Sequence, residues 1–167
     1  MSRPIVYGHH GSKEGVYLAC MERARRRLVE DYRDALVGVS EPRAQLRATA
    51  DVWFSLVERD PARWLALFGG EVPFHGEARE QLHATQSRNA PAYVRAVRSW
   101  VRPDVSDDQV AATASLIYGA GHSMARWWIS NPHVPRTEIV DQYTDFCWNG
   151  LWPLLPVLDH DHDRERD

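Results

Sequence analysis

Residues that begin and end helices recur along this chain and constrain its fold more than any other feature. Pro, Gly and small polar residues divide the sequence into segments whose apolar residues repeat at helical spacing. The segments predicted as helices are 12–37, one that begins near Pro42, 61–68, 77–102, 106–130 and 135–155. No segment is predicted as a strand, so we expect an all-α fold.

Several of the predicted helix ends carry a specific signal. The candidate N-caps are Ser12, Ser40, Asp60 before Pro61, and Ser106, which has Gln109 at the spacing of a capping box. The pair Gly69–Gly70 is expected to stop the helix that precedes it. Pro91 lies inside the segment 77–102 and removes a backbone hydrogen bond, which predicts a kink or a break near Asn89.

Apolar stripes predict the faces that the first two helices bury. The stripe of the first contains Val16, Cys20, Ala24, Leu28, Tyr32 and Leu36, and that of the second contains Leu46, Ala50, Trp53, Phe54 and Val57. Cys20 and Cys147 have no C-x-x-C spacing, and we interpret both as buried, reduced thiols of a cytoplasmic protein. No apolar run approaches roughly 18 residues, so no membrane-spanning helix is expected.

Charge is unevenly distributed along the chain. The net charge of −3 argues against a chain that binds nucleic acid over its whole length. Residues 1–37 hold seven Lys or Arg and five Asp or Glu, whereas residues 157–167 hold two and five. The N-terminal end is therefore slightly basic and the C-terminal end acidic. The acidic C-terminal segment has no apolar residue from Asp159 onward, and we expect it to be disordered.

The stretch 6–20 joins a short segment to the first long helix. Ser12 is placed to cap that helix, and Glu14 lies in its first turn, where the helix dipole favours a negative charge. Free backbone amides and the side chain of Lys13 at the same end suit a bound phosphate. From these residues alone, an ordinary capped surface helix is the better supported alternative.

The string SRPIVYGHHGSKEGVYLA, from Ser2 to Ala19, resembles the end of the DNA-binding domain of the TetR family of transcriptional regulators. In that family the recognition helix ends in an aromatic-rich turn, followed by Gly or Pro, Ser-Lys-Glu and a long linking helix. Tyr7 falls on the family's nearly invariant Tyr, and Lys13 on its phosphate-contacting Lys. His10 stands where the family usually has Phe. The helical remainder also resembles the family's regulatory domain.

This resemblance implies roles in DNA binding and a division of the chain. The implied DNA-binding residues are Ser2, Arg3, Pro4, Tyr7, His9, His10 and Lys13. The resemblance also implies helices before Ser2, and we expect an N-terminally truncated regulator, through a mis-assigned start codon or gene decay. Residues 1–11 are then a remnant of the helix-turn-helix, 12–156 a ligand-binding and dimerisation domain, and 157–167 the tail. Operator DNA is the expected partner of the full-length form, with weak or no binding by this one.

The segments 106–130 and 135–155 carry the pattern of a subunit interface. The first is rich in Ala and Gly, although Gly costs about 1 kcal/mol in a helix interior, and close approach of another helix recovers that cost. The second is apolar on two faces, which indicates two partners. The pair resembles the four-helix dimer interface of the TetR family. The candidate interface residues are Gly121, Met124, Trp128, Tyr143, Phe146 and Gly150. The alternative is a plain intrachain core.

Aromatic residues are concentrated in the middle helices of a chain that contains seven Trp. In the TetR family these helices surround a ligand cavity, which implies an apolar or aromatic small-molecule effector. The candidate ligand-binding residues are Trp53, Phe54, Trp64, Phe68, His83, Tyr93, Tyr118 and His122. For any single aromatic residue, simple core packing is the alternative.

The chain shows no pattern typical of an enzyme. It has no glycine-rich phosphate loop, no metal-ligand spacing on a helix and no local signature of a nucleophile, so we expect no cofactor and no catalysis. The expected function is a ligand-responsive TetR-type repressor, in which the ligand shifts the linking helix and releases DNA. The alternative is a non-DNA-binding, dimeric small-molecule-binding or interaction protein derived from that family.

Overall fold

The computed structural model describes residues 13–69 and 90–156, and every regular element within them is helical. The elements are α2 (Lys13–Ala35), α3 (Pro42–Arg59), α4 (Pro61–Phe68), α6 (Ala90–Trp100), α7 (Asp107–Ile129), α8 (Arg136–Leu151) and the 3-10 helix η1 (Trp152–Leu154). The prediction of an all-α fold is confirmed. None of the described helices is long and apolar enough to cross a membrane.

The start of α3 corrects the predicted cap. Pro42 is the first residue of the helix, so the N-cap position belongs to Glu41 and not to Ser40. The Glu41 carboxylate accepts hydrogen bonds from the backbone amides of Arg43, at 3.0 Å, and Ala44, at 2.6 Å. A carboxylate at this position also interacts favourably with the helix dipole.

Two other predicted starts are confirmed. The Asp60 carboxylate accepts from the amide of Arg63 at 2.9 Å, and Pro61 follows it as the first residue of α4. At α7, the Ser106 hydroxyl accepts from the amide of Gln109 at 3.3 Å, and the Gln109 side chain accepts from the amide of Ser106 at 3.3 Å. These reciprocal bonds form the predicted capping box.

Prolines also account for two helix ends, one beside the predicted break near Asn89 and one that differs from the prediction. Pro91 lies in the first turn of α6, which begins at Ala90, where its missing N–H costs no helix bond. The segment 70–89 lies outside the described residues. At the other end, α8 stops at Leu151, because Pro153 cannot continue an α-helix and lies instead in η1.

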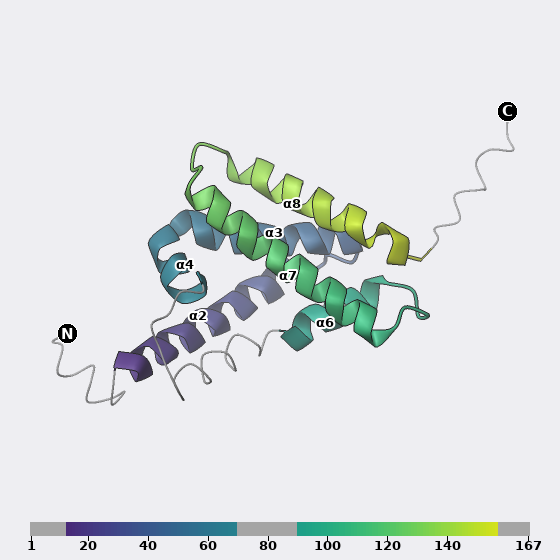
Figure 1. Ribbon diagram of the computed structural model, residues 1–167, viewed down its shortest axis with the longest axis horizontal. Helices are drawn as coiled ribbons and strands as arrows, with labels where there is room; N and C mark the ends of the chain where they lie inside the picture. Colours follow the sequence, from purple (N-terminus) through teal and green to yellow (C-terminus); the bar gives the residue numbers. More distant parts are fainter. Residues whose placement is uncertain (1–12, 70–89, 157–167) are drawn as a thin grey trace, which may run out of the picture.

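Helix α3 lies at the centre of the described fold and packs against α2, α7 and α8 (Figure 1). Helix α7 crosses in front of it, α8 runs above, and α6 packs on α7. The side chains of Phe54, Trp64, Ile139 and Leu151 are fully buried. The predicted apolar stripe of α3 is confirmed, because all five of its residues are buried. Burying a large apolar side chain contributes about 1.5–3 kcal/mol, so this cluster dominates stability.

The buried face of α2 differs from the predicted stripe at Cys20. That residue is exposed, whereas Met21, Ala24 and Leu28 are buried. Successive i+4 steps drift around a helix of 3.6 residues per turn, so a long stripe with that spacing leaves the buried face. The prediction of a buried thiol is wrong for Cys20 and confirmed for Cys147.

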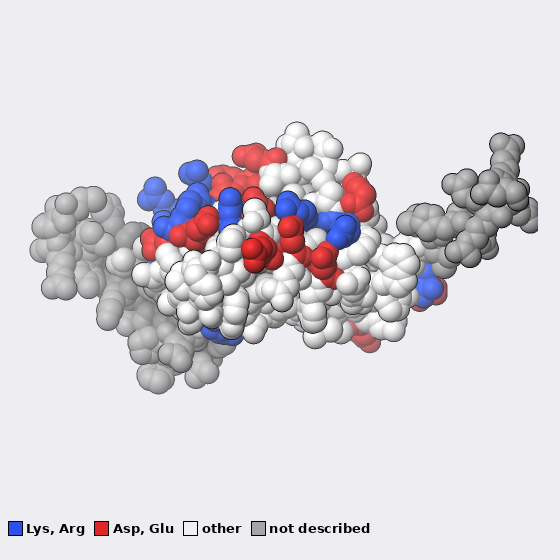
Figure 2. Space-filling model, turned by 90° about the horizontal axis from the view of Figure 1, so that it is seen from above, with Lys and Arg blue, Asp and Glu red and all other residues white. Residues whose placement is uncertain are grey.

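Ion pairs run along the seam between α3 and α8. Arg43 pairs with Asp145, and Arg47 pairs with Asp141 at 2.8 Å. Figure 2 shows the resulting mixture of blue and red across the top of the molecule. These side chains are half-exposed, so each pair contributes only about 0.2–1 kcal/mol. The seam orients the two helices, while the apolar core below it supplies most of the stability.

Candidate functional site

A cavity of ≈ 210 Å³ lies between α2, α3, α6 and α7, with one residue of α8 in its wall. Its lining residues are Val29, Tyr32, Leu36, Gln45, Leu46, Thr49, Ala50, Trp53, Ala92, Tyr93, Ala96, Val97, Trp100, Ile117, Tyr118, Gly121, His122 and Tyr143. None of these lining residues is Asp, Glu, Lys or Arg. The wall is therefore apolar and aromatic, with a few uncharged polar groups, as in small-molecule sites.

A glycine allows Trp53 to reach the wall of α7. The indole Nε1 of Trp53 donates a 3.2 Å hydrogen bond to the backbone oxygen of Gly121. A Cβ on Gly121 would lie 3.6 Å from that nitrogen and 3.5 Å from the ring of Tyr143. Larger side chains would enter the space that these two rings occupy. The small residue at position 121 is thus required by packing inside one chain.

Two tyrosines on different helices face each other across the cavity. The side chains of Tyr32, on α2, and Tyr93, on α6, interact with each other. Burial raises the pKa of both phenols, so both remain protonated and uncharged near neutral pH. The pair links the long N-terminal helix to the opposite wall of the cavity.

His122 is uncharged in this environment. Burial, followed by the nearby positive charge of Arg126, lowers its pKa from 6.5 to about 4, and an interaction with the backbone of Phe68 opposes the shift. The ring centroids of Tyr118 and His122 are 4.2 Å apart, and those of Trp53 and His122 are 4.9 Å apart. His122 therefore lies in an aromatic cluster as a neutral imidazole, a hydrogen-bonding group without charge.

Comparison with known proteins identifies the family. Residues 39–151, more than half of the chain, match the family model described as tetracyclin repressor-like, C-terminal domain. The chain belongs to the TetR family of transcriptional regulators. It is 25% identical over 154 residues to the HTH-type transcriptional activator FasR of Mycolicibacterium smegmatis, an alignment that covers 90% of this chain and 68% of that protein.

Solved structures of similar proteins share the fold. A TetR-like transcriptional regulator from Rhodococcus sp. RHA1 has a TM-score of 0.68 and 22% identity, covering 91% of this chain and 79% of its own. The fatty acid degradation regulator FadR from Bacillus halodurans has a TM-score of 0.76 and 12% identity, covering 90% and 83%. At these identities the likeness concerns the fold, and it agrees with the TetR-type arrangement predicted from the sequence.

The structure brings four of the eight predicted ligand-binding residues together in the cavity wall. They are Trp53, Tyr93, Tyr118 and His122. Phe54 belongs to the core instead, where its ring makes edge contacts with Trp128 and Tyr143. Whether the four wall residues bind a ligand stays a prediction.

Two further candidates, Trp64 and Phe68, lie behind the wall. Each makes an edge contact with Trp53, with ring centroids 5.6 and 5.5 Å apart, respectively. They line a separate, more open hollow between α2, α3 and α4, which also contains Arg23, Arg27, Arg59 and Arg63. They do not line the first cavity, and their role in ligand binding stays a prediction. The last candidate, His83, lies outside the described residues.

Several wall residues were not predicted as ligand-binding. Tyr32 and Ala50 were assigned only to apolar stripes, and Tyr143 was assigned to the dimer interface. A usable signal was present in α3, where Leu46, Thr49, Ala50 and Trp53 follow the i, i+3, i+4, i+7 spacing of one helix face. No comparable signal in the sequence pairs Trp100 with Gln45, although the indole Nε1 of Trp100 donates to the side-chain oxygen of Gln45 across 55 positions of the chain.

The predicted interface residues of the TetR-type dimer divide into two groups. Gly121, Trp128 and Tyr143 are buried within one chain, so the prediction is corrected for these three, because a buried residue presents no surface to a partner. Met124 is half-buried against the same core. Phe146 is 72% exposed, and a Cβ on Gly150 would meet nothing within 4 Å. These two remain candidates.

Most of the predicted DNA-binding residues of this TetR-family chain precede the first described residue. Ser2, Arg3, Pro4, Tyr7, His9 and His10 lie outside the described residues, and Lys13 is the first residue of α2. Among the described residues, no group of three or more His, Cys, Asp or Glu is arranged to hold a metal ion.

Proposed function

We propose that this TetR-family regulator responds to a small apolar or aromatic effector that binds in the cavity between α2, α3, α6 and α7. The observation that carries the proposal is the composition of the wall, which is aromatic and uncharged and encloses ≈ 210 Å³. A well-packed core leaves few voids larger than a water molecule, so a cavity of this size inside a small domain favours a binding role. The proposal assigns a regulatory role and no catalytic residue.

Helix α2 connects the cavity to the proposed DNA-binding end. Val29, Tyr32 and Leu36 of α2 belong to the cavity wall, and the same helix begins at Lys13, the proposed phosphate contact. An effector that binds one position of α2 more tightly than another shifts the helix toward that position. In a dimer such a shift changes the separation of two recognition helices, and thereby the affinity for operator DNA.

The sign of the response is a separate part of the proposal. We propose that effector binding releases DNA, as in a repressor. The relative FasR is named as an activator, so the sign needs its own measurement. A reporter gene under the natural operator should rise with effector if the chain represses, whereas a fall would assign activation.

We further propose that the outer faces of α7 and α8 bind a second copy of the chain. Leu116 is 73% exposed and Trp127 is 49% exposed, and the spacing of eleven residues places them on one face of α7. Helix α7 has no charged residue between Asp108 and Arg126, so its burial desolvates no charge over this length. Phe146 extends the apolar surface onto α8.

A thermal-shift screen of uncharged apolar and aromatic compounds tests the cavity. A ligand that binds only the folded state raises the melting temperature. Ala96→Phe fills the cavity from α6 and should abolish the shift, while Ala112→Phe adds the same bulk to an exposed position of α7 outside the cavity and should leave the shift unchanged. A hit that stabilises both variants equally, or no hit in a broad screen, would refute the proposed cavity ligand.

A further inference from the structure

Most polar groups in the cavity wall are hydrogen-bonded within the protein. Trp53 donates to the backbone of Gly121, Trp100 donates to Gln45, and Gln45 donates to the backbone of Val39. Thr49 donates to its own helix, Tyr143 donates to the backbone of Ile117, and Tyr32 interacts with Tyr93. A buried polar group that has a partner gains little from a ligand, whereas one without a partner costs free energy until something binds it. The unengaged groups therefore indicate where a ligand's polar atom would bind.

Two groups in the described part of the wall are not engaged in this way. Tyr118 is 38% exposed at the edge of the wall, and its hydroxyl has no hydrogen-bond partner among the described residues, which leaves it free to bind a ligand. The ring of His122 interacts with the backbone of Phe68 at the end of α4 and makes no side-chain hydrogen bond with another described side chain. The two residues are one helical turn apart on α7, and their ring centroids are 4.2 Å apart. One ligand atom can therefore contact both.

His122 and Tyr118 together can both accept a hydrogen bond from a ligand and donate one to it. The neutral imidazole of His122 has one N–H donor and one acceptor nitrogen, so His122 can accept a hydrogen bond from a ligand. The Tyr118 hydroxyl can donate. A group that donates to one and accepts from the other satisfies both, and a hydroxyl is the smallest group that does so. An ether, ketone or ester can only accept, and a carboxylate can only accept and also brings a charge.

The size and charge of the cavity restrict the rest of the ligand. A cavity of roughly 150 Å³ is known to hold benzene, so ≈ 210 Å³ corresponds to roughly eight to ten non-hydrogen atoms. An ionised group placed here would lose its hydration without gaining a charged partner among the described lining residues, none of which carries a formal charge. Long chains and anionic compounds are therefore disfavoured.

We propose that the effector is a small, uncharged hydroxyl compound, a phenol or a cyclic alcohol, whose OH donates to His122 and accepts from Tyr118. Its ring lies against the aromatic wall formed by Trp53 and Tyr93. This inference rests on the proposed function of the cavity as the effector site, and it adds the chemical class of the effector and the two residues that select it.

Three probes test the inference by calorimetric titration at neutral pH: 4-ethylphenol, its isomer 4-methylanisole, and 4-methylbenzoate. The phenol and the anisole have the same atoms, but the anisole oxygen cannot donate. We expect the phenol to bind about tenfold more tightly than the anisole, the effect of about one hydrogen bond. We expect 4-methylbenzoate to bind more weakly than both.

Two variants test the contribution of Tyr118. Tyr118→Phe removes a hydroxyl with no described protein partner, so the fold should be unaffected, and the affinities for the phenol and the anisole should fall alike, by up to about tenfold, because both oxygens accept from Tyr118. Tyr143→Phe removes a hydroxyl from the same wall, but one that is already bonded to Ile117, so both affinities should remain. Circular dichroism of both variants controls for folding.

The outcomes separate this inference from the proposed function. If the phenol and the anisole bind equally, or if Tyr118→Phe binds the phenol as tightly as the parent protein does, the cavity remains a ligand site and the hydroxyl assignment is overturned. If 4-methylbenzoate binds most tightly, the uncharged class is overturned in the same way. If none of the three probes binds, the proposed effector site fails together with the inference.

Discussion

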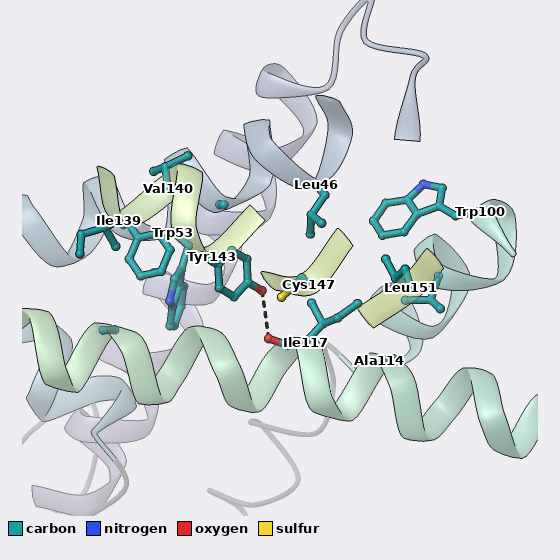
Figure 3. Packing of buried hydrophobic residues seen from close by; sticks show 14 of the residues in the cluster. Leu46, Trp53, Trp100, Ala114, Ile117, Ile139, Val140, Tyr143, Cys147 and Leu151 are labelled. Carbon is teal, nitrogen blue, oxygen red and sulfur yellow. Dashed lines mark hydrogen bonds between the residues drawn. The ribbon is translucent and has the colours of Figure 1, made fainter. Parts of the chain in front are cut away.

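The hydroxyl of Tyr143, on α8, donates a 2.9 Å hydrogen bond to the backbone oxygen of Ile117, on α7 (Figure 3). Both residues belong to the cavity wall, and the ring of Tyr143 also contacts Phe54 of α3, with centroids 5.5 Å apart. This one side chain therefore joins three helices at the point where the core becomes the cavity. It couples the shape of the cavity to the packing of α8, the helix proposed to contact a second copy.

Tyr143→Phe should destabilise the fold by about 1 kcal/mol, because the buried hydrogen bond is lost while the ring contacts remain. The measurement is urea unfolding followed by circular dichroism. Tyr118→Phe is the matched control, since its hydroxyl has no partner among the described residues, and its midpoint should not change. An equal loss in both variants would mean that the Tyr143–Ile117 bond contributes nothing specific.

The contrast between two glycines tests which face of the helices is free. A Trp at position 121 has no space, because Trp53 and Tyr143 already lie within 3.6 Å of the Cβ position, so Gly121→Trp should prevent stable folding. A Trp at position 150 meets nothing within 4 Å in one chain. Gly150→Trp should therefore leave the protomer folded and weaken the proposed dimer.

Sedimentation velocity and thermal melting distinguish these two effects. The expected result for Gly150→Trp is a monomer with a cooperative melting transition, beside a dimeric parent protein. A parent protein that sediments as a monomer at micromolar concentration would refute the proposed interface. If Gly150→Trp forms the same dimer as the parent protein, the interface does not include this part of α8.

The stability of the domain should fall as pH decreases through the range set by His122. Burial, followed by the charge of Arg126, lowers its pKa from 6.5 to about 4, so between these values the unfolded chain binds a proton that the folded chain does not. Stability therefore decreases from pH 6.5 down to about 4, by up to about 3 kcal/mol for this group.

His122→Gln isolates that contribution. The amide does not titrate and can still donate to the backbone of Phe68, so unfolding free energies measured from pH 6.5 down to about 4 should decline less steeply than in the parent protein. Parallel curves for the two proteins would show that His122 titrates normally in the folded chain.

Helix boundaries could be predicted from the sequence because local chemistry determines them. Asp60 and Pro61 begin α4, and Ser106 with Gln109 begins α7, through contacts within four residues of the chain. The cap of α3 was placed one residue too early, at Ser40. Two residues that can both cap stand side by side there, and only the position of Pro42 in the folded helix distinguishes them.

The inward face of α7 could not be predicted in the same way. Gly119 and Gly121 are two residues apart, so they lie on nearly opposite sides of the helix, and small residues occur on both. Position 121 is buried because Trp53 and Tyr143 pack against it from other helices. The same limit applies to the aromatics, since composition does not distinguish Phe54 in the core from Trp53 beside a cavity.

The central claim is that a ligand in the cavity acts on α2. Hydrogen–deuterium exchange, measured with and without a saturating uncharged ligand such as 4-ethylphenol, tests it directly, because local opening of a helix determines its exchange rate. The account predicts slower exchange in the part of α2 that contains Val29, Tyr32 and Leu36, as well as in α7 around His122. Unchanged exchange throughout α2, in a sample where calorimetry shows the ligand bound, would contradict the claim.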